Sequence, residues 1–209
     1  MKRGFDLLMA FAGLVLLFPL LILVAVLVKA DSRGPIFFRQ ERIGRGFRPF
    51  LIYKFRTMIS DTSGKGRLIT VGNDPRITRA GRLLRATKID ELPQLINVFK
   101  GEMSFVGPRP EVREYVELFR KDYEKILKIR PGITDLASVK YHNEAAILEQ
   151  AENPEDEYVR RVLPEKIELA REYLQRSSLF FDLVLIFKTL CKLFEFRTSS
   201  LKGPLHERH

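Results

Sequence analysis

The sequence has little cysteine and histidine. Cys191 is the only cysteine among 209 residues, and two of the three histidines lie within the last four positions. A single cysteine cannot form an internal disulfide, which is typical of a protein from a reducing compartment. Structural zinc sites are built from clusters of cysteine and histidine. No such cluster occurs in the sequence, which therefore indicates no zinc-stabilised domain.

Internal repeats and low-complexity tracts are also absent. Hydrophobic residues make up 45% of the chain and charged residues 30%, which provides enough apolar material for a core and argues against general disorder. A chain of 209 residues is expected to form one domain, with two small domains as the alternative.

Positive charge is concentrated in one block of the chain. The net charge is +10, and the block from Lys29 to Arg113 holds 18 basic and 8 acidic residues, so it carries the whole excess. The rest of the chain is electrically balanced. The partner of this block is therefore expected to be anionic, which leaves nucleic acid, a lipid headgroup or a phosphorylated small molecule.

The N-terminus carries a long hydrophobic run. It extends over 22 residues from Leu7 to Val28, and a bilayer-spanning helix needs about 20. The apolar core of a secretory signal peptide is usually about 7–15 residues long. Because this run is longer and leads directly into charged residues, we set cleavage aside and expect a membrane segment.

Pro19 lies in the middle of this run, where it removes a backbone donor and disturbs a helix. Basic residues flank both ends, with Lys2 and Arg3 before the run and Lys29 and Arg33 after it. Since positive charge prefers the cytoplasmic side, we expect residues 1–30 to form a re-entrant membrane helix that is broken at Pro19 and returns to the cytoplasm. A straight transmembrane helix is the alternative.

The remainder predicts a mostly helical α+β domain over residues 31–196, with a small irregular β element around the active site. Short strands at 36–39 and 50–55 flank a glycine turn, residues 60–74 form a loop, and Thr78 caps a helix that ends at Ala86. An amphipathic helix with one apolar face is expected at 111–129, and further helices at 143–152 and 156–176, the last divided by Pro164. The apolar segment 178–196 contains charges and predicts an amphipathic helix in the membrane interface. Residues 197–209 are expected to be a disordered tail.

An acidic pair, Asp90 and Glu91, lies in the most basic part of the sequence. The segment 90–101 predicts a helix with Asp90 at its N-cap, Pro93 in its first turn and Gly101 at its end. Its buried face is expected to hold the apolar residues spaced at helical intervals, Leu92, Leu95, Ile96 and Phe99. On this interpretation the pair only caps a helix.

A second interpretation gives the pair a chemical role. Cations precede it at Arg76, Arg79, Arg82, Arg85 and Lys88. Nearby positive charge lowers the pKa of a carboxyl group, so both carboxylates are expected to be ionised. An ionised aspartate can attack phosphorus, and arginine side chains can then stabilise the charge on the phosphate oxygens. Arg85 and Arg109 are the candidates for this task.

Three motifs together resemble the bacterial sugar transferase family, the monotopic phosphoglycosyl transferases. They are KFRTM at 54–58, R-x4-DELPQ-x2-N-x2-KG-x-MS-x-VGPRP at 85–110, and RPGIT at 130–134. The resemblance covers nearly the whole chain. Two departures stand out, since many relatives carry Ser-Pro at the helix bend and glycine after RPGIT, where this chain has Phe18-Pro19 and Asp135.

The resemblance implies transfer of a sugar-1-phosphate from a UDP-sugar to polyprenyl (undecaprenyl) phosphate, with release of UMP. The implied route is ping-pong through a phosphosugar ester on Asp90, with Glu91 as its acidic partner. Mg²⁺ is the implied cofactor, with Asp90 and Glu91 as its candidate ligands. Such a reaction begins the assembly of exopolysaccharide, capsule or O-antigen.

The resemblance also implies a substrate-binding set and a location. The set comprises Arg85, Arg109, Pro108, Pro110, Lys54 and Asp182. For Lys54 the alternative is a basic surface facing anionic lipid, and Arg56 shares that alternative. The implied location is the cytoplasmic face of the bacterial inner membrane, with anionic lipid as a partner, no nucleic acid, and a homodimer left open.

Two other functions remain as alternatives. The basic block would suit a membrane-anchored module that binds lipid or nucleic acid. The same Asp90 could also serve a phosphohydrolase that uses water as the acceptor and acts on nucleotide sugars. The two hydrophobic elements favour a lipid acceptor over water.

Overall fold

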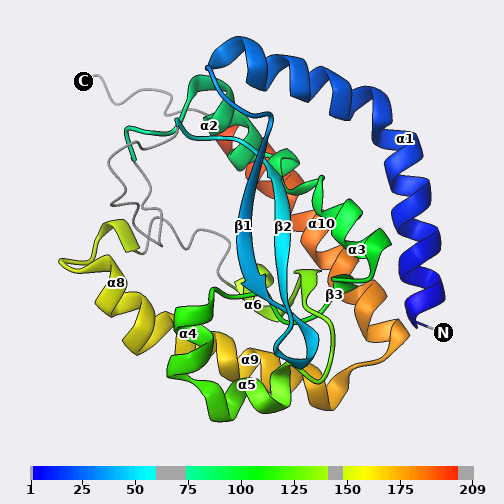
Figure 1. The fold of residues 1–209 in the computed structure, drawn as a ribbon, viewed down its shortest axis with the longest axis vertical. Helices are drawn as coiled ribbons and strands as arrows, with labels where there is room; N and C mark the ends of the chain where they lie inside the picture. Colours follow the sequence, from blue (N-terminus) through cyan, green and yellow to red (C-terminus); the bar gives the residue numbers. More distant parts are fainter. Residues whose placement is uncertain (1, 60–73, 141–147, 202–209) are drawn as a thin grey trace, which may run out of the picture.

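A computed structural model describes residues 2–59, 74–140 and 148–201, with side chains to position 192. The predicted loop at 60–74 lies almost entirely outside these ranges, as does half of the predicted helix at 143–152. The described chain is mainly helical with two small sheets (Figure 1). The prediction of a mostly helical α+β fold is therefore confirmed.

The hydrophobic N-terminus forms one long helix, α1 (Lys2–Asp31). The helical conformation continues through Pro19, and the ribbon bends partway along its length (Figure 1). A proline inside a helix is a common cause of such a bend. By length and composition, α1 is the one helix in the described ranges that could cross a membrane. Most of its large apolar side chains are exposed, including Leu8, Phe11, Val15, Leu16, Phe18, Leu23 and Val26.

One face of α1 packs on the rest of the molecule. Near its start, Ala10 joins a buried cluster with Val98 and Met103. Near its end, Val24 and Val28 join a second cluster with Phe55, Leu84 and their neighbours. Helix α1 therefore lies against the folded domain along much of its length.

A β-hairpin follows α1. Strands β1 (Phe37–Ile43) and β2 (Pro49–Phe55) pair antiparallel. They lie on either side of a glycine-containing turn, as predicted, and this turn contains a short 3₁₀ helix (Arg45–Phe47). The other edge of β2 is covered by the Asn97 side chain. Its amide donates to the Leu51 carbonyl at 2.8 Å and its oxygen accepts from the Tyr53 N–H at 3.1 Å. The hairpin is thereby attached to the helix that carries Asn97, α3 (Gln94–Lys100).

A second, smaller sheet pairs two short segments for which the sequence predicted no strand. Strands β3 (Ser104–Val106) and β4 (Gly132–Thr134) run parallel, with Ser104 opposite Gly132 and Val106 opposite Thr134. The two chains approach closely, because a Cβ on Gly132 would lie 2.1 Å from the backbone nitrogen of Gly107. Glycine is required at this crossing.

Helix α2 (Arg79–Ala86) begins as predicted, with the Thr78 hydroxyl accepting from the Gly81 N–H at 3.0 Å. The helix predicted at 111–129 is two helices, α4 (Arg113–Leu118) and α5 (Arg120–Ile126). They are separated at Phe119, whose φ of −115° and ψ of 35° are not helical. The predicted apolar face is nevertheless buried, and it packs against the C-terminal helices.

The C-terminal part is helical. A short helix, α6 (Leu136–Lys140), follows β4. Helix α8 (Pro154–Glu157), a π-helical turn (Tyr158–Val162) and α9 (Leu163–Arg176) follow one another without a gap, so the predicted division near Pro164 is present as a change of helix type.

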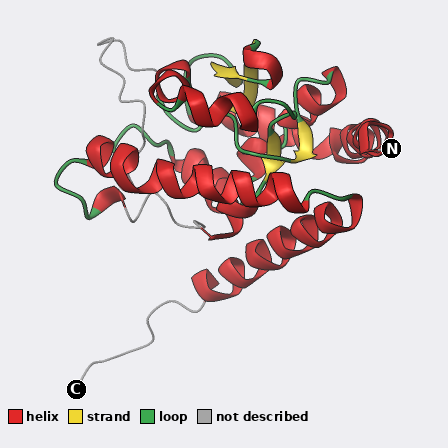
Figure 2. Ribbon diagram, turned by 90° about the horizontal axis from the view of Figure 1, so that it is seen from below, coloured by secondary structure: helices red, strands yellow, loops and turns green. Residues whose placement is uncertain are grey.

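The last helix, α10 (Leu179–Leu201), lies on the outside of the molecule beside α9 (Figure 2). It buries Asp182 and Leu185 and exposes the apolar side chains of Leu179, Phe180, Leu183, Phe187 and Leu190. The predicted amphipathic character is therefore present. The helix continues five residues into the segment expected to be a disordered tail.

Candidate active site

The acidic pair lies in a 3₁₀ turn, Ile89–Glu91, and the prediction that Asp90 is a helix N-cap is wrong. Helix α3 begins later, after Pro93. An N-cap carboxylate accepts from the N–H two or three residues further on. The third residue after Asp90 is Pro93, which has no N–H. Lys88 precedes the turn with a φ of +56°, an uncommon conformation for a side-chain-bearing residue.

The Asp90 carboxylate is buried, with 7% of the residue exposed. Its Oδ1 atom has no hydrogen-bond partner among the described residues. Burial, followed by the charge of Glu91, raises the pKa of Asp90, although Lys54 and Lys88 act in the opposite direction. The expectation that the cations lower the pKa of both carboxyl groups is therefore wrong for Asp90. The site leaves this oxygen poorly solvated and unbonded.

Glu91 has the opposite environment. Its Oε1 atom accepts from Lys54 Nζ and from Arg109 Nη2, each at 2.7 Å. Burial alone would raise the pKa of Glu91, but Arg109 and Lys54 together hold it well below its ordinary value. Burial lowers the pKa of Lys54, with Glu91 opposing that shift. Glu91 thus holds two cations beside Asp90.

Arg85 is held by two residues that follow strand β2. Its Nε donates to the Thr57 hydroxyl at 3.0 Å and its Nη2 contacts Met58 Sδ at 3.4 Å. Burial lowers the pKa of Arg85, and the negative charge of Asp90 opposes this. Arg85 therefore lies close enough to act on Asp90 through its charge, without a hydrogen bond to it.

The Pro-Arg-Pro loop connects β3 to α4. Pro108 and Pro110 are buried, whereas Arg109 is partly exposed and reaches Glu91. The prolines thus shape the loop, and Arg109 is the side chain that extends from it to the acidic pair. Lys54, Arg85, Glu91 and Arg109 are therefore brought together around Asp90, from β2, α2, the 3₁₀ turn and this loop.

Asp182 belongs to a different cluster. It is 3% exposed, and its two oxygens accept from Lys2 Nζ and from the Tyr173 hydroxyl, each at 2.6 Å. Lys2 also donates to the Val106 carbonyl at 2.9 Å. This cluster, Lys2–Tyr173–Asp182, joins the start of α1 to α9, α10 and the end of β3.

The family model "Bacterial sugar transferase" matches residues 1–196. The chain belongs to this family.

Curated relatives of this bacterial sugar transferase are named for a reaction or a process. The UDP-N-acetylgalactosamine-undecaprenyl-phosphate N-acetylgalactosaminephosphotransferase of Aeromonas hydrophila is 40% identical over 194 residues, covering 90% of this chain and 42% of the relative. The UDP-glucose:undecaprenyl-phosphate glucose-1-phosphate transferase of Escherichia coli K12 is 37% identical over 198 residues, covering 93% and 40%. The exopolysaccharide production protein ExoY of Rhizobium meliloti is 37% identical, covering 90% and 83%. The chain thus spans about two fifths of the first two relatives and most of the third.

Sequence reasoning missed two supporting residues of this sugar transferase, Arg56 and Thr57. The Arg56 guanidinium is buried and donates to the carbonyls of Val28, Ser32 and Arg33 at the end of α1. The alternative that Arg56 faces lipid is therefore wrong. Both residues belong to the KFRTM motif and lie directly after β2, so the motif was the signal available in the sequence. Lys54 contacts Glu91, and Arg56, two residues later, closes the end of α1.

Metal binding by protein ligands alone is not supported within the described ranges, where no group of three or more His, Cys, Asp or Glu could hold an ion. Mg²⁺, however, is commonly held by one or two carboxylates together with substrate phosphates. The Asp90 carboxylate, whose Oδ1 is unpaired, fits that mode. The hydrogen bonds that Lys54 and Arg109 donate to Glu91 both end on Oε1, which leaves Oε2 as a candidate second ligand.

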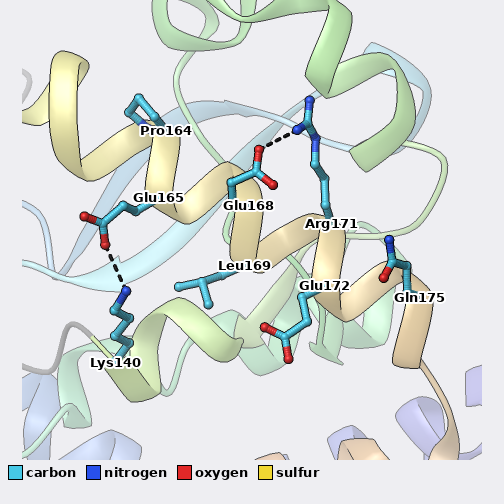
Figure 3. Close-up of a pocket in the computed structure, with 8 residues that line it drawn as sticks. All are labelled: Lys140, Pro164, Glu165, Glu168, Leu169, Arg171, Glu172 and Gln175. Carbon is cyan, nitrogen blue, oxygen red and sulfur yellow. Dashed lines mark hydrogen bonds and ion pairs between the residues drawn. The ribbon is translucent and has the colours of Figure 1, made fainter.

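An open surface groove lies elsewhere, along α9 and α6 (Figure 3). Ion pairs cross it or border it, with Lys140 and Glu165 2.9 Å apart and Arg171 paired with Glu168. None of the predicted site residues lines it. Its lining residues are Lys140, Pro164, Glu165, Glu168, Leu169, Arg171, Glu172 and Gln175.

Proposed function

We propose that the chain transfers a sugar-1-phosphate from a UDP-sugar to polyprenyl phosphate and releases UMP. The observation that carries this proposal is the buried, unbonded Oδ1 of Asp90 beside a glutamate that holds two cations. Relatives named as undecaprenyl-phosphate sugar phosphotransferases support the substrate classes, and ExoY supports a place in exopolysaccharide production.

In the first half-reaction, Asp90 Oδ1 attacks the phosphorus that bears the sugar. The new bond joins Oδ1 to phosphorus, and the bond between that phosphorus and the bridging oxygen breaks. UMP leaves with the electron pair. A carboxylate with a raised pKa and no hydrogen bond is more basic and less solvated than an exposed aspartate, which favours its action as a nucleophile.

In the second half-reaction, a phosphate oxygen of polyprenyl phosphate attacks the same phosphorus. The bond between Asp90 and phosphorus breaks, and the carboxylate is regenerated as polyprenyl diphosphate sugar forms. Both steps move negative charge among phosphate oxygens. Preorganised cations stabilise such charge without reorganising during the reaction.

Arg85, Lys54 and Arg109 supply this positive charge. Glu91 holds Lys54 and Arg109 in place, so these cations face the reacting phosphate in a defined position. Arg85 is oriented separately by Thr57. Pro108 and Pro110 shape the backbone that presents Arg109.

Asp90 and Glu91 are the residues that would hold Mg²⁺ together with the substrate diphosphate. The bound ion would offset negative charge on the diphosphate oxygens. Because Glu91 Oε1 is shared by two cations and Asp90 Oδ1 is the attacking atom, Glu91 Oε2 and the second oxygen of Asp90 are the atoms available for this role.

The membrane arrangement is part of the proposal. Both ends of α1 attach to the same folded domain, through Lys2 and Arg3 at the start and through Arg56 at the end. A helix crossing the bilayer would place its ends on opposite sides. The double attachment and the bend therefore support a re-entrant, monotopic helix, with the domain on the cytoplasmic face of the inner membrane. The exposed apolar face of α10 would lie in the same interface.

Product analysis tests this function. The purified chain in detergent or nanodiscs is incubated with a panel of UDP-sugars and Mg²⁺, with and without undecaprenyl phosphate. The expected result is sustained UMP release only with the lipid, together with a lipid-linked sugar diphosphate. Sustained UMP release without the lipid would indicate hydrolysis. Binding to anionic vesicles without turnover on any sugar would indicate a lipid-binding module.

A further inference from the structure

The Pro-Arg-Pro loop lies along the segment that contains RPGITD. The Gly107 N–H donates to the Thr134 carbonyl at 3.1 Å, and the Gly132 N–H donates to the Pro108 carbonyl at 3.0 Å. These bonds continue the β3–β4 pairing beyond the strands. The segment 131–135 therefore fixes the backbone of the loop through these hydrogen bonds.

Backbone bonding cannot continue in the same way at the end of the loop. Pro108 and Pro110 have no N–H, so Arg109 provides the single backbone donor of this tripeptide. That donor bonds to the carboxylate of Asp135, with 3.2 Å between Arg109 N and Asp135 Oδ2. A side chain thus takes the place of a strand carbonyl.

The other oxygen of Asp135 has a separate task. Oδ1 accepts from the Ser138 N–H at 2.7 Å and from the Ser138 hydroxyl, which caps the start of α6. The residue is 6% exposed. One buried carboxylate, directly after β4, therefore connects the loop to the start of α6 through its two oxygens.

We propose that Asp135 is a positioning residue for Arg109. By fixing the Arg109 backbone, it keeps the guanidinium on Glu91 Oε1, 2.7 Å away and beside Asp90. The inference rests on the proposed function, because the value of that placement lies in the cation it delivers to the reacting phosphate.

The task requires two acceptors on one short side chain. Glycine offers none and serine offers one oxygen, while asparagine offers one acceptor and one donor. Asparagine can satisfy either Arg109 or Ser138, and its amide nitrogen would face an N–H at the other position. The expected order of activity at this position is therefore aspartate, then asparagine, then alanine.

A double-mutant cycle tests whether Asp135 acts through Arg109. Asp135→Ala should lower kcat/KM on the order of tenfold, the size expected for losing a hydrogen bond to a charged group. In an Arg109→Ala background the same change should have little further effect, because the side chain it positions is gone. If the two substitutions lower kcat/KM independently, so that the double variant shows the product of the two single reductions, the proposal is wrong.

The matched control is Asn153→Ala, which removes another helix cap. Asn153 accepts from the N–H groups of Glu155 and Asp156 at the start of α8. It should lower thermal stability to a similar extent and leave kcat/KM unchanged. If the wild type and this control both lack transfer, the proposed function fails. If both are active and Asp135→Ala has the same kcat/KM as they do, the positioning role is wrong.

Hydrogen exchange gives a readout that does not depend on activity. Of residues 107–110, only Gly107 and Arg109 carry an exchangeable amide, since the others are prolines. Asp135→Ala should increase exchange in a peptide covering this loop, whereas Asn153→Ala should not. Unchanged protection in Asp135→Ala would overturn the proposal whether or not the protein turns over.

Discussion

Two buried aspartates in this molecule have nearly the same exposure and opposite bonding. Asp182 uses both oxygens, one for Lys2 and one for Tyr173. Asp90 is surrounded by positive charge and yet leaves Oδ1 without a partner. A buried acceptor without a partner costs free energy, commonly about 1–3 kcal/mol. On the proposed function, Asp182 serves the fold, whereas Asp90 serves the chemistry at the expense of stability.

Asp90→Asn separates the two roles most strongly. Removing the nucleophile should lower transfer by about 10⁴-fold or more. Folding favours the protonated form of Asp90, whose pKa is raised, so the ionised carboxylate destabilises the protein at pH values above that pKa. The variant should therefore unfold at the same temperature as the wild type or higher at pH 7. Scanning calorimetry and UMP release check both parts, and a lower unfolding temperature would contradict the comparison.

Glu91→Gln should lower activity by roughly 10²–10³-fold, because Lys54 and Arg109 lose the charge that holds them. It should also lower stability, in contrast to Asp90→Asn. The pKa of Glu91 is depressed in the folded state, so its stabilisation is present above its ordinary pKa and is lost as pH falls through the depressed value. Unfolding temperatures measured across acidic pH should converge for variant and wild type. A constant difference at every pH would argue against the charge as its cause.

The rate of the first half-reaction should depend on pH through Asp90. Because the pKa of Asp90 is raised, the carboxylate should protonate at a higher pH than an ordinary aspartate, and below that point the rate should fall about tenfold per pH unit. Rapid-quench measurement of the first equivalent of UMP checks this. A rate that stays constant down to the pKa of an exposed aspartate would contradict the raised value.

Asp182→Asn should have the smallest effect on chemistry and a clear effect on stability. Loss of the charge-assisted bond to Lys2 should cost about 2 kcal/mol of unfolding free energy. Activity per folded molecule should remain within a few-fold of wild type. Tyr173→Phe is a useful companion, since it removes the other hydrogen bond of Asp182 and keeps the ring. A large loss of turnover at unchanged stability in either variant would place this cluster in the substrate site.

Local sequence patterns predicted the elements that local interactions determine. The short strands predicted on either side of a glycine turn form the hairpin. Thr78 identified the start of α2, and Gly101 identified the end of α3. The apolar face of 111–129 was also correct, although the helix divides at Phe119. In each case the determining residues lie within a few positions of one another.

Contacts between distant residues could not be predicted in this way. Strands β3 and β4 have three residues each, too short for a pattern, and pair across 28 positions. Lys2 and Asp182 lie 180 residues apart. The residue types of the candidate active site could be predicted from the motifs. Which carboxylate takes the cations and which remains unbonded depends on the 3₁₀ turn that holds the pair and on the approach of Arg109 from another loop.

The central claim is that Asp90 itself accepts the phosphosugar. Mass spectrometry of the protein and of its peptides tests this claim most directly. The protein is incubated with a turnover-competent UDP-sugar in the absence of polyprenyl phosphate, then quenched and digested. The account predicts a mass increase of one sugar phosphate located on Asp90, which disappears when the lipid is added and is absent from Asp90→Asn. Sustained transfer by the wild type with no adduct, or an adduct that persists in Asp90→Asn, would contradict it.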